Sequence, residues 1–268
     1  ESYRFNGIPL LENELGLNFW RAMTDNDRGN KLHERSSVWR DAGTNKVLTF
    51  FLVDAKSPST TVVTTEYSLP TTLSVCKIVY TITGDGEITV DYQLQPGNDL
   101  PELPEVGMMT LLNSSFDTIT WYGKGPYENY WDKEKGAKIG LYTGKVKDQY
   151  VPYLKPQECG NKTGVRWAVL SDQQGAGLKI TGNPTVEVNA LPYTPVELEE
   201  HDHGYKLPPS IKTVVRINYK QMGVGGDDSW GQKTHPEFTL FANRCYSYTF
   251  KLKGISVKDL LPMSCDFD

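Results

Sequence analysis

Alternation of apolar and polar residues is the dominant pattern along this chain. Between 86 and 95 every second residue from Ile88 to Leu94 is apolar, which is typical of a strand with one buried face. The preceding run 73–83 is also strand-like, and the turn sequence Thr-Gly-Asp-Gly connects the two. The segment 73–95 therefore predicts a β-hairpin.

Similar strand-like runs recur at short intervals, with Gly, Pro, Asn and Asp in the connections. This spacing predicts an all-β antiparallel sandwich instead of alternating βαβ units. The predicted strands are 47–54, 61–67, 165–170, 177–181, 185–190, 212–219, 237–242 and 245–252.

Helices are expected to be scarce. The best candidate is 31–42, where Leu32 and Trp39 share one face and Gly43 offers a stop. A short turn is predicted near 195–200, a long loop at 96–105, and irregular structure after about 253. No repeat or linker divides the sequence, so 1–268 is expected to form one domain.

Composition and charge exclude several classes of protein. A chain of 268 residues can bury a core without disulfides, although only 38% of its residues are hydrophobic. The net charge of −5 and the absence of a basic stripe argue against nucleic-acid binding. No apolar run approaches the ~18 residues of a membrane span. The chain opens without Met, which suggests a piece excised from a longer protein, so its localisation stays open.

The four cysteines show neither close pairing nor metal-type spacing. They are Cys76, Cys159, Cys245 and Cys265, and the sequence does not choose among the three possible disulfide connectivities. Cys76 and Cys245 lie in strand-like runs, so both are predicted to be buried thiols.

The Gly-rich run 223–230 ends in Trp230 and is unsuited to a helix or a central strand. An indole on such a loop suits the flat apolar face of a sugar ring. Asp227 and Asp228 offer acceptors for sugar hydroxyls, and His235 follows closely in the sequence. These four residues are the predicted substrate-binding set, with Trp230 first among them.

Three further polar motifs each allow more than one interpretation. The run 25–30 resembles a calcium loop, but Ser36 stands where a bidentate carboxylate is needed, so a capping turn, a sugar-site wall or a domain contact stay open. The aromatic run 121–130 is either a loop closing the sandwich or a ligand or interdomain surface. His201 and His203 alone lack the ligands of a zinc site. No metal site is predicted.

Catalytic signatures are missing from the sequence. No Ser-His-Asp elbow, phosphate loop or dinucleotide fingerprint occurs. Glycoside hydrolysis needs two carboxyl groups on either side of the scissile bond, and no spacing rule identifies such a pair here. The residues themselves therefore leave catalysis unproven, and no catalytic residue is assigned.

Taken together and in order, these segments resemble the C-terminal fifth domain, or small chain, of the large β-galactosidases of glycoside hydrolase family 2. The matching runs are 19–29 (FWRAMTDNDRG), 123–132 (GKGPYENYWD), 150–153 (YVPY) with 157–160 (QECG) and 165–167 (VRW), and 225–230 (GGDDSW). Cys159 stands where the family commonly has Asn, and Trp131 is a second departure; both put only local packing in doubt.

The resemblance implies an antiparallel β-supersandwich related to galactose mutarotases. The family hydrolyses terminal β-galactosides with retention through two glutamates of a separate (β/α)₈ barrel. Trp230 resembles a tryptophan of the galactoside-binding wall. Mg and Na ions of the parent enzyme are expected mainly in other domains, and no cofactor in this chain. The expected partners are the sugar, the remaining domains and, for the parent, further subunits.

Two other functions stay open on the residues. An aldose 1-epimerase could use His201, His203 or His235 with a carboxylate as acid and base, although a shared fold does not carry function. A freestanding carbohydrate-binding module would use Trp230 alone. An exposed apolar patch is expected where the missing domains would pack.

Overall fold

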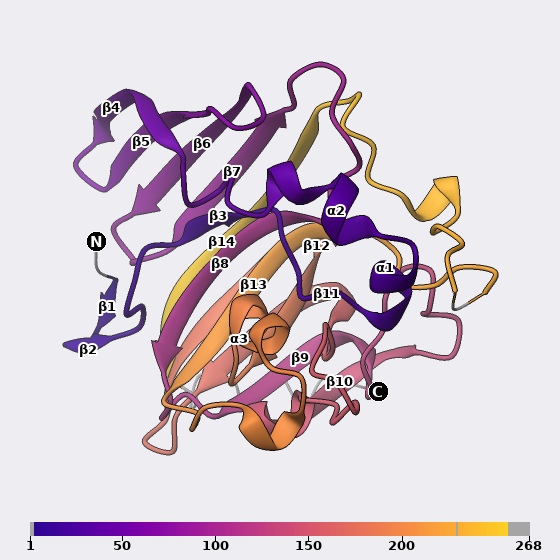
Figure 1. Cartoon of the computed structure of the whole chain (residues 1–268). Helices are drawn as coiled ribbons and strands as arrows, with labels where there is room; N and C mark the ends of the chain where they lie inside the picture. The colour runs from indigo at the N-terminus through magenta and orange to yellow at the C-terminus, as the bar shows by residue number, and fades with distance from the viewer. Residues whose placement is uncertain (1–2, 229, 257–268) are drawn as a thin grey trace.

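The computed structural model describes residues 3–228 and 230–256, and nearly all regular structure in them is β (Figure 1). The strands are β1 Arg4–Phe5, β2 Ile8–Pro9, β3 Gly16–Asn18, β4 Val47–Ser57, β5 Thr60–Leu69, β6 Ser74–Thr83, β7 Ile88–Gln95, β8 Glu105–Asn113, β9 Thr118–Gly125, β10 Lys138–Lys145, β11 Lys162–Ser171, β12 Ala176–Leu191, β13 Lys212–Gln221 and β14 Tyr246–Ser256. The predicted all-β antiparallel fold is confirmed.

Within the described residues, twelve of these strands form one curled antiparallel sheet. Its main path runs β10-β9-β11-β12-β14-β7-β6-β5-β4, while β13, β8 and β3 branch from β12. The branch arises because β12 exchanges partners along its length. Residues 176–183 pair with β14, and residues 187–191 pair with β13. The sheet thereby divides into two layers that enclose the apolar core.

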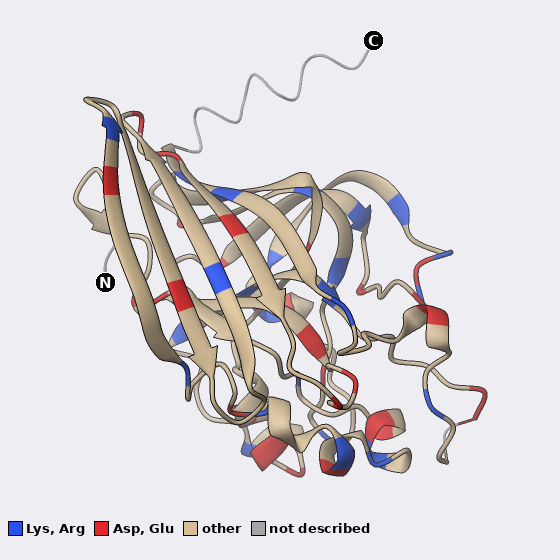
Figure 2. Cartoon of the chain, turned by 90° about the horizontal axis from the view of Figure 1, so that it is seen from above, with Lys and Arg blue, Asp and Glu red and all other residues tan. Residues whose placement is uncertain are grey.

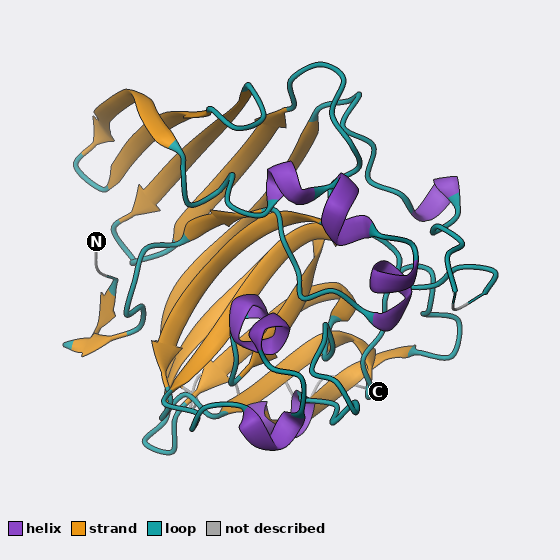
Figure 3. Cartoon of the chain, in the orientation of Figure 1, coloured by secondary structure: helices purple, strands orange, loops and turns teal. Residues whose placement is uncertain are grey.

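Short helices lie on one side of the curled sheet (Figure 3). They are α1 Asp25–Gly29, α2 Leu32–Arg35 and α3 Pro195–Glu200, with 3₁₀ turns η1 Ser37–Trp39, η2 Val146–Gln149, η3 Gly204–Lys206 and η4 Pro236–Phe238. None of the helices in the described residues is long and apolar enough to cross a membrane. Lys, Arg, Asp and Glu are interspersed over the ribbon (Figure 2).

Several predicted elements are confirmed. The hairpin 73–95 is β6 and β7, the turn near 195 is α3, and 96–104 is a loop. The predicted irregular segment after 253 lies largely outside the described residues, although β14 continues to Ser256.

Three predictions were wrong. The helix 31–42 is divided into α2 and η1, because the Ser36 hydroxyl donates to the Glu102 carbonyl and ties the chain to a neighbouring loop. Gly43 is no helix stop; any side chain there would clash with the Leu17 carbonyl. The run 237–242 is no strand, since Pro236 opens η4 and the segment then continues without regular structure.

The aromatic run 121–130 is only partly a loop. Its first residues complete β9, where Trp121 is buried as part of a strict alternation of buried and half-buried positions. Cys76 and Cys159 are buried free thiols, but Cys245 is exposed because it precedes the first residue of β14. The buried position predicted for Cys245 was therefore wrong, and Cys265 lies outside the described residues.

Candidate functional site

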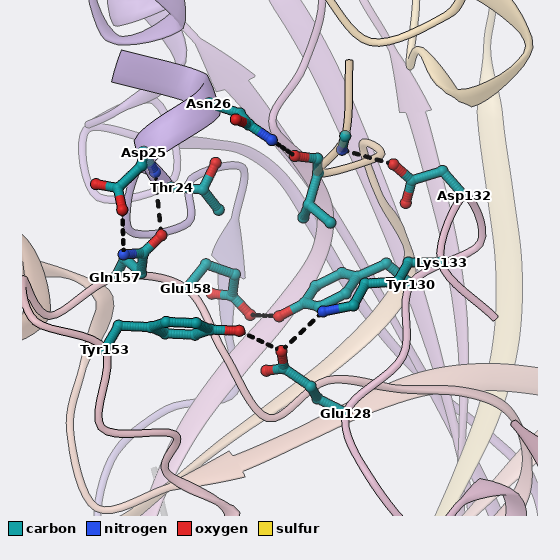
Figure 4. A pocket seen from close by; sticks show the side chains of 12 residues that line it. Thr24, Asp25, Asn26, Glu128, Tyr130, Asp132, Lys133, Tyr153, Gln157 and Glu158 are labelled. Atoms are coloured by element: carbon teal, nitrogen blue, oxygen red, sulfur yellow. Dashed lines mark hydrogen bonds and ion pairs between the residues drawn. The ribbon is translucent and has the colours of Figure 1, made fainter. Parts of the chain in front are cut away.

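A cavity of about 430 Å³ opens where four segments distant in sequence meet. One segment is the N-terminal end of α1, two are loops after β9 and after η2, and the fourth follows β13. Their side chains converge on one polar space (Figure 4). The lining residues are Thr24, Asp25, Asn26, Glu128, Tyr130, Asp132, Lys133, Tyr153, Gln157, Glu158, Val224 and Gly225.

The first wall of the pocket depends on how α1 begins. Thr24 accepts from the Asp27 amide, and the Asp27 side chain accepts from the Thr24 amide, so both ends of a capping box are present. The fully buried Arg21 also pairs with Asp27 at 3.0 Å. Asp27 is therefore fixed inside the protein, while Asp25 faces the pocket and accepts from the Gln157 amide at 3.0 Å.

Glu128 is an acidic residue of the pocket that accepts hydrogen bonds from three neighbouring groups. It accepts from the Tyr153 hydroxyl at 2.7 Å and the Lys133 ammonium at 3.3 Å (Figure 4). It also accepts from the Gly160 amide at 2.8 Å. Burial and the bond to Glu128 raise the pKa of the Tyr153 phenol. Tyr153 therefore stays a neutral donor, and Glu128 is held in place as an acceptor.

A layer of buried charge lies beneath the pocket. Arg216 on β13 donates to Glu105 on β8 at 2.6 Å. It also donates to both carboxylate oxygens of Glu158, at 2.7 Å and 2.6 Å. Glu158 in turn accepts from the Tyr130 hydroxyl of the pocket wall. Burial raises the pKa of Glu105, whereas the Arg216 guanidinium opposes that shift. Such a charge-assisted layer fixes the pocket floor in one geometry.

Glu187 on β12 is a second buried carboxyl group below the site. It accepts from the Gln221 amide and the Asn161 side chain, both at 3.0 Å. Burial raises its pKa to about 7. No described cationic side chain donates a hydrogen bond to it, so this group changes charge near neutral pH.

The loop carrying Trp230 starts at the wall of this pocket. Arg21 donates to the carbonyls of Met222 and Gly223, which links the loop to α1. Asp132 accepts from the Gly225 amide at 2.7 Å, and Asn26 donates to the Val224 carbonyl at 2.9 Å. The base of the loop is therefore anchored on both sides.

The far end of that loop projects into solvent. Trp230 is 81% exposed. The Asp228 carboxylate accepts from the backbone amides of Trp230, Gly231 and Gln232, and these bonds lower its pKa. One oxygen of Asp228 is thus committed to the loop itself, and this bonding orders the segment that bears the indole.

Asp227 and His235 pair across the loop, with 2.7 Å between Oδ1 and Nε2. Both side chains are exposed, and the Asp227 carboxylate raises the pKa of the imidazole. The structure brings all four predicted substrate-binding residues onto one loop region, which continues from the pocket-lining Val224 and Gly225, but none of the four lines the cavity itself. Their contact with substrate stays a prediction.

The other predicted polar motifs have structural partners. His201 contacts the Glu197 carbonyl at 2.6 Å, at the end of α3, and His203 lies 3.3 Å from Asp202, just before η3. In the described part of the chain, no three or more His, Cys, Asp or Glu residues are grouped in a way that could hold a metal ion.

Sequence reasoning missed several pocket residues. Glu128 was included only within the run 121–130, one interpretation of which was a ligand or interdomain surface, and Tyr153, Gln157 and Asp132 were given no role. Their signal was the turn-rich composition around Pro126 and Pro152, which places polar side chains on loops. The pairings themselves join segments 25 to 132 residues apart and leave no local pattern.

Three large side chains close in sequence to pocket residues are exposed. Tyr127, next to Glu128, is 83% exposed, and Leu154, next to Tyr153, is 85% exposed. Trp230 is the third, on the loop that continues from the pocket-lining Val224 and Gly225.

Comparisons with known proteins identify the family of the chain. Residues 1–252 match the family model of the beta galactosidase small chain. A β-galactosidase of Priestia megaterium is 52% identical over 95% of this chain and 24% of its own length. One of Halalkalibacterium halodurans is 35% identical over 95% of this chain and 25% of its own length. Galactose 1-epimerase of Lactobacillus acidophilus has a TM-score of 0.47 at 8% identity, over 95% of this chain and 75% of the other.

The fold is that of an all-β antiparallel domain with a polar pocket between its loops. The chain belongs to the β-galactosidase small-chain family. It spans about a quarter of the length of the curated relatives it matches, and is thus one part of a larger polypeptide.

Proposed function

We propose that this chain is the non-catalytic C-terminal domain of a β-galactosidase. Trp230 forms part of the wall of the galactoside site, and the two glutamates of the retaining reaction lie in a barrel domain elsewhere in the polypeptide. The Mg and Na ions of the whole enzyme are bound mainly outside this chain. The whole enzyme is a homo-oligomer in this proposal.

One observation carries the proposal. An indole stands 81% exposed on a loop whose base is hydrogen-bonded into the wall of a polar pocket. Exposing that much apolar area is unfavourable in water. A sugar ring can cover one face of the indole, while Asp227, Asp228 and His235 lie close enough in the loop to receive its hydroxyl groups.

The first test asks whether the isolated chain is catalytically inactive, as the proposal requires. The purified chain should not hydrolyse a nitrophenyl β-galactoside, because no catalytic carboxyl pair is assigned to it. Polarimetry of α-galactose should likewise show no acceleration of mutarotation. Clear turnover in the first assay would contradict the proposal, and accelerated mutarotation would favour an aldose 1-epimerase instead.

A second test measures what the indole contributes. In a complete β-galactosidase containing this chain, Trp230→Ala should raise KM roughly fivefold, since stacking on a flat ring contributes about 1 kcal/mol at the lower end of its range. The value of kcat should change less, and Trp230→Phe should lie between the two.

Tyr205→Ala is the matched control, because Tyr205 is an equally exposed aromatic residue that lies in η3 and not on the loop that carries Trp230. It should leave both kinetic constants unchanged. An unchanged KM in Trp230→Ala would remove Trp230 from the site.

A further inference from the structure

The loop that carries Trp230 is closed at its base by its own hydrogen bonds. The Gly223 amide donates to the Phe238 carbonyl at 2.9 Å, which joins the two ends of the loop. The Thr234 hydroxyl donates to the carbonyls of Gly223 and Gly225, at 3.0 Å and 3.1 Å. Because the outer part of the loop is also bonded to itself, a displacement of the base moves the indole as well.

Two neighbouring residues between β9 and β10 contact both ends of this loop. Asp132 accepts from the Gly225 amide at 2.7 Å, on the first end. The ring of Trp131 meets the ring of Phe238 on the second end in a T-shaped contact, with 5.5 Å between the centroids. The orientation of the loop therefore depends on side chains from a distant part of the sequence, since 93 residues separate Asp132 from Gly225.

Trp131 is itself held against the sheet. The Lys220 ammonium lies over its ring, 4.1 Å from the centroid. A cation above an indole face is attracted by the negative face of the ring. Lys220 belongs to β13, the strand that precedes the Trp230 loop, whereas Phe238 belongs to η4. Trp131 therefore connects the sheet to the second end of the loop.

The glycines at the first end of the loop leave room for Asp132. A side chain at Gly223 would bring its Cβ within 2.7 Å of the Asp132 carboxylate, and a side chain at Gly225 would bring it within 3.3 Å. Glycine is suited to both positions because the carboxylate approaches the loop backbone so closely. The base of the loop and the Asp132 carboxylate therefore fit each other closely.

We propose that Trp131 and Asp132 are positioning residues for Trp230, which hold its loop in the orientation in which the indole meets the sugar. This inference rests on the proposed function, in which Trp230 forms part of the galactoside wall. A ring that is held in place before the ligand arrives binds more tightly than a ring that the ligand must order. The two residues act on binding only through the indole.

A double-mutant cycle in a complete β-galactosidase containing this chain tests the coupling. Asp132→Ala should raise KM about two- to fivefold and change kcat less, because its effect through Trp230 cannot exceed the loss of the indole itself. In a Trp230→Ala background the same substitution should leave KM unchanged, since no indole remains to be positioned. Asp132→Asn keeps an oxygen acceptor for the Gly225 amide and should restore most of the affinity.

Lys135→Ala is the matched control, because Lys135 is exposed on the same loop as Asp132. It should leave KM unchanged in both backgrounds. Trp131→Leu loses the ring contacts and should raise KM only when Trp230 is present. Circular dichroism confirms that the variants are folded. An equal rise in KM for Asp132→Ala with and without Trp230 would overturn the proposal, because Asp132 would then act independently of the indole.

A measurement on the isolated chain separates this inference from the proposed function. With fluorotryptophan in place of tryptophan, the fluorine NMR signal of Trp230 is the one that Trp230→Phe removes. Asp132→Ala and Trp131→Leu should each shift that signal, and Lys135→Ala should not.

The two proposals then fail in different ways. If the Trp230 signal shifts but Trp230→Ala leaves KM unaltered, the loop is positioned as inferred and the contact with the galactoside is refuted. If neither Asp132→Ala nor Trp131→Leu moves the signal, the positioning role is refuted, whatever the effect of Trp230→Ala on KM.

Discussion

The buried charge layer under the pocket and the β4 strand are opposite extremes of one sheet. Arg216, Glu105 and Glu158 are ionisable yet fully enclosed, whereas the apolar side chains of β4 are about half exposed. The charges can be buried because each has a partner within hydrogen-bond distance. The apolar residues stay exposed because no layer of this chain covers their strand. In these two regions the position of a strand in the sheet, more than the type of residue, therefore determines whether a side chain is buried.

The largest effect should come from removing the cation of the buried layer. Arg216→Met leaves Glu105 and Glu158 facing each other without a counter-charge, so we expect a loss of about 3–5 kcal/mol in the free energy of unfolding. Urea denaturation followed by circular dichroism measures it. Lys251→Met, which breaks the exposed pair with Glu87, should change that free energy far less. Equal losses of unfolding free energy in the two variants would contradict the contrast between buried and exposed charge.

The next effect is a pH dependence from Glu187. Burial raises its folded pKa to about 7, above the 4.5 of an unperturbed carboxyl, so the folded state holds the proton more tightly. Its contribution to stability is therefore complete below pH 4.5 and lost as pH rises through 7. Glu187→Gln keeps an acceptor for Gln221 and Asn161 and should be about 2–3 kcal/mol more stable than the unaltered chain at pH 8.

Urea titrations at several pH values measure this difference. The gain should disappear near pH 4. Glu200→Gln, at the exposed end of α3, is the control, and its stability relative to the unaltered chain should not change with pH. If Glu187→Gln changed the free energy of unfolding by the same amount at every pH, the substitution would act through packing and not through charge.

A smaller effect is expected at the uncovered strand. Leu52→Ala removes a side chain that is only half buried in the monomer, so unfolding of the dilute chain should lose about 1 kcal/mol or less. Leu178→Ala on β12, which is fully buried, should lose about 2–5 kcal/mol. Comparable losses would mean that β4 is already packed in solution, which would remove the contrast between the two regions.

The smallest expected effect concerns the exposed pair on the Trp230 loop. The Asp227 carboxylate holds the pKa of His235 above its usual value, so Asp227→Asn should lower that pKa in an NMR titration. Glu237→Gln should lower it less, because Glu237 lies 3.7 Å away and Asp227 only 2.7 Å. A larger decrease in the pKa of His235 for Glu237→Gln would show that the imidazole pairs mainly with Glu237.

Much of the fold follows from sequence pattern, with clear limits. Half-buried strands such as β6 and β7 alternate in polarity and were predicted. Strands β8, β9 and β10 were missed; the first four residues of β8 are buried without alternation, whereas β9 alternates but begins the aromatic, glycine-containing run that was interpreted as a loop. The helix 31–42 failed because a tertiary bond from Ser36 outweighs local propensity.

The site was partly predictable for a similar reason. The glycine-rich run around Trp230 shows locally that the indole stands on a loop. The local sequence does not reveal the partners of Asp27 and Glu128. Arg21 and Tyr153 come within hydrogen-bond distance of them only in the folded chain. A sequence can indicate which side chains lie on loops, but the pocket they share depends on contacts between distant segments.

The partner exchange along β12 has a consequence for how the molecule comes apart. Residues 176–183 hold β14 and its neighbours, residues 187–191 hold β13 and β8, and the single strand β12 supplies both sets of hydrogen bonds. Neither half of the sheet can detach without exposing the edge that supports the other. The domain should therefore lose its structure in a single cooperative transition and not half by half.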